Sequence, residues 1–184
     1  MQLPGFGDTS NLQTYTALPP LVFEDSEYLF LMTMPSFDSE ARKFYFADTG
    51  NHFWKVLAVI YNMPADTEEE RTALCKANRI AIWSVLKSCK RHLSQQDTTT
   101  DEVYNDMAGF LKEHPTIKKL ICVSRMAEHE IERENWNFPA DVEVVYVPSP
   151  SGADFMYEHI SELEPIYARA LDRPQAQEQP ENWY

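Results

Sequence analysis

The sequence lacks the short motifs that identify most nucleotide-binding and hydrolytic enzymes. It has no GxGxxG fingerprint, Walker-type loop, GxSxG elbow or HExxH zinc motif. Of its 184 residues, five are glycine and three are cysteine: Cys75, Cys89 and Cys122. This number and spacing of thiols fit neither a disulfide framework, a metal knuckle nor an iron–sulfur cluster. We therefore expect three reduced and mostly buried cysteines.

Long hydrophobic runs are also missing. The apolar stretches 28–34 and 53–61 are far shorter than the ~18 residues that a membrane span requires. The first basic residue is Arg42, and the N-terminus lacks the positive leader and apolar run of a secretory signal. Hydrophobic residues make up 43% of the chain, enough for one buried core. We expect a monomeric cytosolic protein without a membrane partner, associated with the nucleoid if it is bacterial.

Positive charge is scarce, since the formal net charge is −13. The acids gather in the terminal stretches 1–41 and 154–184, whereas residues 76–91 contain five basic residues and no acid. Overall charge therefore does not exclude a local anion-binding surface, although a solvated basic face explains the run equally well. If DNA is the partner, the cations expected nearest its phosphates are Lys87, Lys90, Arg91 and Arg125.

Apolar runs alternate with helical patterns along the chain. Buried strands are predicted near residues 28–34, 80–86, 119–124 and 142–147. Helices are predicted from near residue 51, from a capping box at Thr67 and Glu70, over 101–114, over 126–135, and finally up to about residue 171. Residues 1–27 are interpreted as an irregular arm, 28–172 as one α/β domain and 173–184 as a tail.

This alternation predicts a three-layer α/β/α fold with a mainly parallel four-stranded sheet. Ligands of such sheets bind beyond the carboxyl ends of the strands. The topology thus brings together three segments that follow predicted strands. They are Met34, Pro35 and Ser36 after the first, Ser124 and Arg125 after the third, and Pro148, Ser149, Pro150, Ser151 and Gly152 after the fourth.

The most distinctive segment is residues 44–57, which read Phe-Tyr-Phe-Ala-Asp-Thr-Gly-Asn-His-Phe-Trp-Lys-Val-Leu. From the residues alone, it is a turn followed by an amphipathic helix, in which Asn51 caps the N-terminus while Phe53 and Trp54 enter the core. An aromatic pair, a turn and Asn-x-Phe-Trp in this order also resemble the signature of the uracil-DNA glycosylase superfamily. Residues 50–55 are especially similar to its mismatch-specific, thymine-DNA-glycosylase-like branch.

Other segments resemble this superfamily in the same order along the chain. Residues 31–36 are similar to the first motif of the hypoxanthine-DNA glycosylase branch, with Thr33 as a departure. Residues 80–89 resemble its Ile-Ala-Leu-Trp-Asp-Val stretch, with Ser84 in place of the acid, and residues 104–107 resemble its Asn-Asp-Phe stretch. Residues 147–153 resemble the Pro-Ser loop that the superfamily inserts into DNA. Ser124 and Arg125 depart from the usual Phe-Asn-Gly.

The resemblance implies a role for each site residue. Because the first motif contains no asparagine, the catalytic role passes to Asn51, whose amide can orient a water or hold a base carbonyl without titrating. Tyr45 or Phe46 would stack on a flipped base, and the segments around Ser36 and Ser124 would line the pocket. In the loop 148–152, the two serines would contact flanking phosphates while the loop fills the vacated stack.

The leading functional hypothesis is a monofunctional DNA glycosylase that removes uracil or hypoxanthine without a metal or other cofactor. A second hypothesis is a catalytically inactive member of the fold that binds nucleic acid or protein, suggested by the departures at Thr33, Ser84 and Ser124. A hydrolase of small nucleosides is the third. The histidines are scattered along the sequence, which makes a Ser-His-Asp hydrolase a weak alternative.

Overall fold

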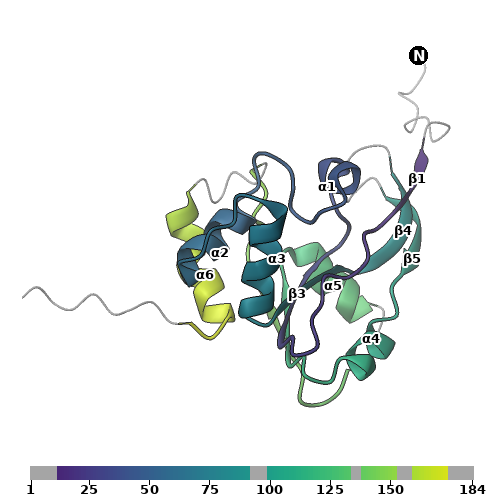
Figure 1. Cartoon of the computed structure of the whole chain (residues 1–184). Helices are drawn as coiled ribbons and strands as arrows, with labels where there is room; N and C mark the ends of the chain where they lie inside the picture. Colours follow the sequence, from purple (N-terminus) through teal and green to yellow (C-terminus); the bar gives the residue numbers. More distant parts are fainter. Residues whose placement is uncertain (1–11, 92–98, 134–137, 153–158, 174–184) are drawn as a thin grey trace, which may run out of the picture.

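The computed structural model describes residues 12–91, 99–133, 138–152 and 159–173, and its centre is a four-stranded parallel sheet (Figure 1). The strands are β2 (Tyr28–Met32), β3 (Ile80–Ser84), β6 (Lys119–Cys122) and β7 (Glu143–Tyr146), in the order β3-β2-β6-β7. All three neighbouring pairs are parallel. The predicted sheet is confirmed, with each strand ending slightly earlier than its apolar run.

The central strand β2 shows why a continuous apolar run forms a buried strand here. All five of its residues are buried. Because side chains alternate across a strand, Phe30 and Met32 pack on one face of the sheet, and Leu29 and Leu31 pack on the other. Both faces of a parallel sheet are normally covered by helices, so both sets of side chains must be apolar.

Helices cover each face of this sheet. The bounds are α1 (Phe37–Arg42), α2 (Phe53–Tyr61), α3 (Glu68–Ala77), α4 (Met107–Glu113), α5 (Arg125–Arg133) and α6 (Ile160–Ala170). The helices α2, α3 and α6 contribute to the cluster around Phe30, whereas α4 and α5 contribute to the cluster around Leu29. Figure 1 shows these two groups on opposite sides of the sheet. The predicted three-layer α/β/α architecture is confirmed.

A second, antiparallel sheet was not predicted. It consists of β1 (Gln13–Thr16), β4 (Leu86–Arg91) and β5 (Thr100–Tyr104), in the order β1-β4-β5. Three expectations are therefore wrong. The described part of the arm 1–27 contains a strand, the run 80–86 is divided between β3 and β4, and the predicted helix 101–114 is helical only in α4.

Local capping explains where two of the helices begin. The predicted capping box of α3 is present, since Thr67 Oγ1 accepts from Glu70 N–H at 3.2 Å and Glu70 Oε2 accepts from Thr67 N–H at 3.1 Å. The helix α4 begins late because Asp106 is its cap, with Oδ1 accepting from Gly109 N–H at 2.9 Å. A residue that caps a helix has a non-helical backbone, so the preceding residues are free to join β5.

The three cysteines are free and buried, as the sequence predicted. Burial raises the pKa of the Cys122 thiol to about 12, and it also raises the pKa of Cys75 and Cys89. Their thiolate forms are thus disfavoured at neutral pH. Within the described residues, no helix is both long and apolar enough to cross a membrane.

Candidate active site

The carboxyl edge of the parallel sheet assembles the three segments that the sequence analysis placed there. The chain leaves β2 towards residues 33–36, β6 towards 124–125 and β7 towards 147–152. Backbone bonds continue the sheet beyond the strands, with Val123 N–H donating to Leu31 O at 3.0 Å and Val147 N–H donating to Cys122 O at 2.9 Å. These exit loops therefore begin side by side.

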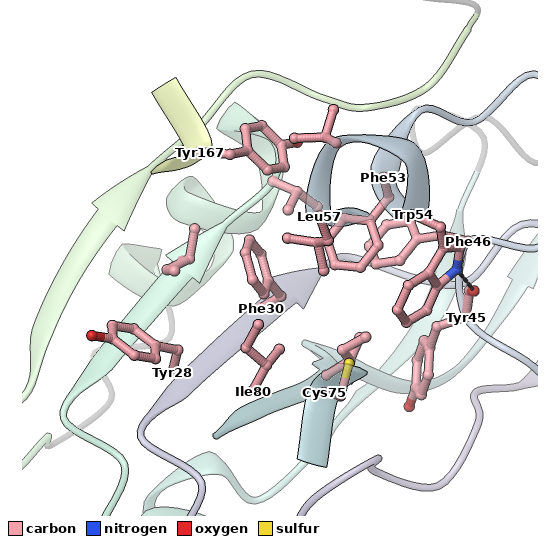
Figure 2. Packing of buried hydrophobic residues seen from close by; sticks show 14 of the residues in the cluster. Tyr28, Phe30, Tyr45, Phe46, Phe53, Trp54, Leu57, Cys75, Ile80 and Tyr167 are labelled. Atoms are coloured by element: carbon pink, nitrogen blue, oxygen red, sulfur yellow. Dashed lines mark hydrogen bonds between the residues drawn. The ribbon is translucent and has the colours of Figure 1, made fainter. Parts of the chain in front are cut away.

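Two aromatic residues that precede α2, Tyr45 and Phe46, belong to the buried cluster that Figure 2 shows, but they have different roles. Tyr45 is buried, and its hydroxyl donates to the carbonyl oxygens of Leu18 (3.1 Å) and Pro19 (2.7 Å), so it anchors the chain that follows β1. Phe46 stacks on Phe53 with a centroid distance of 3.9 Å and also lines a cavity. Burial raises the Tyr45 pKa well above its usual range. Of the two predicted stacking residues, Phe46 is the one at the cavity.

Asn51 lies on the same cavity, immediately before α2. Its backbone N–H donates to Asp48 O at 3.1 Å, and its Oδ1 accepts from Phe53 N–H at 2.9 Å. The side chain therefore supports the start of α2, as the structural interpretation predicted, although the N-cap position itself is His52. Of the two terminal atoms of the Asn51 side chain, only Oδ1 can accept from a backbone N–H, so the amide nitrogen Nδ2 faces away from the Phe53 N–H. It makes no hydrogen bond with the residues that the structure describes.

The cavity has a volume of about 350 Å³ and combines polar, charged and aromatic groups. Its lining residues are Arg42, Phe46, Ala47, Asp48, Thr49, Asn51, Trp54, Lys55, Ala58, Ala65, Asp66 and Arg71. An aromatic face and an amide at one cavity are the groups expected to hold a planar heterocycle by stacking and hydrogen bonding.

The first motif supports this cavity rather than lining it. Ser36 caps α1 by accepting from Ser39 N–H at 3.2 Å, and its Oγ lies 3.3 Å from Asp48 Oδ1. Met34 is buried and packs with residues of β4, and the Pro35 carbonyl accepts from Arg91 Nη1 at 2.6 Å. Asp48 in turn accepts the backbone N–H of Asn51, so this motif positions Asn51 indirectly.

The loop 148–152 is attached to the segment that carries Asn51. His52 N–H donates to Pro150 O at 2.8 Å, and Tyr167 of α6 donates to Pro148 O at 2.7 Å. Within the loop, Ser149 Oγ accepts from Ser151 N–H at 3.2 Å. Asn51 and this loop are therefore neighbours, but the prediction that the loop lines the same pocket is wrong for the 350 Å³ cavity, because none of the residues 148–152 lines it.

Gly152 permits this close approach, because a Cβ atom there would lie 2.4 Å from the Gly50 carbonyl oxygen. We expect Gly152→Ala to displace the loop and to lower the free energy of unfolding by about 1 to 3 kcal/mol, the usual cost of overpacking. Gly50→Ala is the matched control, since its Cβ would meet nothing nearer than 3.9 Å. Thermal unfolding of both variants measures the difference, and equal midpoints would contradict the proposed contact.

Ser124 and Arg125 lie at the carboxyl edge but outside the cavity lining. Ser124 Oγ accepts from Ala127 N–H at 3.0 Å and so caps the first turn of α5. The Arg125 guanidinium lies 3.8 Å from the centroid of the Tyr146 ring and donates to Glu128 at 2.8 Å. Its side chain is 72% exposed and therefore accessible to DNA. Its predicted contact with DNA stays a prediction.

The prediction for Arg91 is wrong, because its side chain is only 1% exposed. Besides its bond to Pro35, the guanidinium donates to Glu40 Oε2 at 3.2 Å and lies over the rings of Phe37 and Tyr15. A cation enclosed in this way is not available to a DNA phosphate. It instead joins β4 to α1, a contact that sequence patterns do not predict because Glu40 is distant from Arg91 along the chain.

The two predicted lysines of β4 are exposed. Lys90 forms an ion pair with Asp101 at 3.0 Å, and Lys87 makes none with the described residues. Neither lysine lines the cavity. The cations that do so, Arg42, Lys55 and Arg71, were not singled out from the sequence. Only Lys55 carried a signal, because it ends the Asn-x-Phe-Trp-Lys stretch.

Comparison with known proteins first identifies the class. The fold resembles the solution NMR structure of a Methanosarcina acetivorans protein described as a candidate uracil DNA glycosylase, with a TM-score of 0.66 and 26% identity, covering 86% of this chain and 99% of that one. The parallel sheet, the helix that follows Asn51 and the Pro-Ser loop thus define an α/β domain of the uracil-DNA glycosylase superfamily. No family model matches the sequence.

Curated relatives then identify the family. A hypoxanthine DNA glycosylase of Methanosarcina acetivorans is 32% identical over 155 residues, covering 81% of this chain and 95% of the relative. A hypoxanthine DNA glycosylase of Methanosarcina barkeri is 28% identical over 105 residues, covering 56% of this chain and 66% of the relative. The chain belongs to the hypoxanthine DNA glycosylase family.

Proposed function

We propose that this DNA N-glycosylase excises a deaminated base, hypoxanthine or uracil, by flipping the nucleotide into the cavity that holds Phe46 and Asn51. Family membership supports the reaction class, and both relatives are named for hypoxanthine. The single observation that carries the choice of cavity is that these two residues line it together beside the attached loop 148–152. The reaction requires no metal or cofactor, and we propose a monomer acting on damaged DNA.

In this proposal the base stacks on Phe46, whose other face is supported by Phe53. The Asn51 amide nitrogen donates a hydrogen bond to a base carbonyl or to the attacking water. Water oxygen forms a bond to C1′ while the N-glycosidic bond breaks, and the bonding electron pair leaves with the base. A proton from the water is released to solvent or to the departing base, which leaves an abasic sugar.

The loop 148–152 is proposed to occupy the space that the flipped nucleotide leaves in the duplex. It projects from the carboxyl edge and is held at Pro148 and Pro150 by backbone carbonyl contacts. Ser149 and Ser151 then lie near the flanking phosphates. Because the loop is already held in place before DNA binds, it loses less conformational entropy on insertion into the duplex. This offsets part of the cost of unstacking a base.

The experiment is base release from oligonucleotide duplexes that contain a single hypoxanthine or uracil, followed by alkaline cleavage at abasic sites. We expect strand cleavage for at least one lesion and none for undamaged duplex. Binding without release would contradict the proposal and favour the inactive-member hypothesis. Turnover of free deoxyinosine or deoxyuridine without release from oligonucleotides would instead favour a nucleoside hydrolase.

A further inference from the structure

Three cations on three different helices line the Asn51 cavity. Arg42 is at the end of α1, Lys55 is in the first turns of α2 and Arg71 is in α3. None of the three forms an ion pair with a residue that the structure describes. By contrast, Arg79, Lys90, Arg91, Lys118, Lys119 and Arg125 are each paired with a carboxylate.

Arg71 is held in place without a carboxylate partner. Its Nε donates to Ala65 O at 2.9 Å, and its guanidinium lies 5.5 Å from the centroid of the Trp54 ring. Burial lowers the Arg71 pKa; the carboxylates of Asp66 and Glu68 oppose this shift, and the positive charge of Arg42 adds to it. The two guanidinium groups therefore repel each other, and an anion near both would relieve that repulsion.

Two carboxylates also line the cavity and limit this positive potential. Asp48 lies 3.3 Å from the Ser36 hydroxyl, and exposed Asp66 acts electrostatically on Arg71. Among the lining residues, three cations stand against two carboxylates, with Glu68 outside the lining also acting on Arg71, whereas the chain as a whole has a net charge of −13. A local excess of this kind concentrates anions where the overall charge repels them.

We propose that Arg42, Lys55 and Arg71 bind backbone phosphates of the DNA strand that carries the flipped nucleotide. This inference rests on the proposed function, because a base held by Phe46 and Asn51 brings its own flanking phosphates to the same cavity. Guanidinium groups match phosphate oxygens in a planar, two-bond geometry, and the lysine adds a compact charge. These three cations, and not the exposed lysines Lys87 and Lys90 of β4, then contact the DNA.

The test is the dependence of duplex affinity on salt, measured for the wild type and for the variant Arg42→Gln/Lys55→Gln/Arg71→Gln. Each lost phosphate contact should make the slope of log affinity against log salt shallower by about 0.9. A fourfold rise in salt should then weaken binding by roughly 3.5-fold less for each contact removed. Affinity is measured for both a lesion duplex and an undamaged duplex. The salt dependence of binding is then obtained even if the protein releases the base from the lesion duplex.

The matched control is Lys76→Gln/Lys87→Gln/Lys112→Gln, which removes equal charge from three exposed lysines outside the cavity. We expect its slope to stay close to that of the wild type. An equal change in both triple variants would overturn the proposal, since it would reflect net charge alone. Because Arg71 also supports the fold, Arg42→Gln/Lys55→Gln is the second variant, and an unchanged slope there would overturn the roles of Arg42 and Lys55.

Inorganic phosphate separates a DNA site from a site for the free ion. Phosphate replaces chloride at constant ionic strength while DNA binding is followed for the wild type and the double variant. Stronger competition by phosphate in the wild type than in the double variant, together with the shallower salt dependence of DNA binding by the variant, supports the proposal. Saturable phosphate binding that the variant loses while the DNA slope stays unchanged would overturn it. Absence of base release by the wild type would count against the proposed function alone.

Discussion

Replacing Asn51 with alanine is expected to slow base release by roughly 30- to 1000-fold. This corresponds to about 2 to 4 kcal/mol, the usual cost of removing one positioned hydrogen-bonding group from a transition state. The variant should remain folded, because losing the oxygen that accepts from Phe53 N–H costs at most about 1 kcal/mol. Single-turnover release from a lesion duplex measures the rate, and thermal unfolding measures the stability.

Asn51→Asp is the control that separates these two roles. Aspartate retains an oxygen for the Phe53 N–H but replaces the amide nitrogen with an acceptor, and both residues cap helices equally well. We therefore expect wild-type stability together with slow base release. Full activity in Asn51→Asp would show that the amide donates no essential hydrogen bond. Full activity in Asn51→Ala would remove Asn51 from the mechanism altogether.

The parallel sheet was predictable because its information is local. The strands β2, β3 and β6 are short apolar runs with mostly buried side chains, and β2 is buried throughout, whereas the edge strand β7 is partly exposed. The position of the exit loops then follows from the parallel arrangement alone. Asn51 and Phe46 are also close in sequence, so a single segment was sufficient to predict that they share a site.

The antiparallel sheet depends on contacts that are distant in sequence. Val103 is 49% exposed and continues the helical spacing of Met107 and Phe110, so β5 looked like the first turn of α4. Besides the local Asp106 cap, tertiary contacts hold residue 105 outside the helix: the Asn105 side chain donates to Ser84 O at 2.9 Å and to Leu86 O at 3.2 Å. Pattern reasoning could not find these partners, because they lie on strands of two different sheets.

The charged part of the site was unpredictable for a related reason. Arg42, Lys55 and Arg71 belong to separate helices, and only packing brings them to one cavity. Arg91 lies in a run of basic residues that resembles a solvated face, yet the fold encloses it. Sequence periodicity assigns a residue to a face of its own element, but it does not say what covers that face.

Replacing Arg91 with methionine is expected to lower the free energy of unfolding by roughly 2 to 4 kcal/mol. Breaking a buried ion pair from one side leaves the other charge and a carbonyl without a partner. The estimate lies near the lower end of the usual range because the Glu40 side chain retains 20% exposure and is partly solvated. Urea unfolding with an unchanged slope against denaturant measures the loss.

The double variant Arg91→Met/Glu40→Gln identifies the cause of this destabilisation. If the unpartnered Glu40 carboxylate is responsible, the double variant should recover part of the lost stability, and the two changes should be non-additive. Additive losses would instead assign the effect to the Pro35 carbonyl and to packing against Phe37.

The loss of Arg91 also disturbs the segment beside Ser36, whose hydroxyl contacts the Asp48 side chain, and Asp48 O in turn accepts from the Asn51 backbone N–H. Base release by the folded Arg91→Met variant should therefore also be slower than that of the wild type.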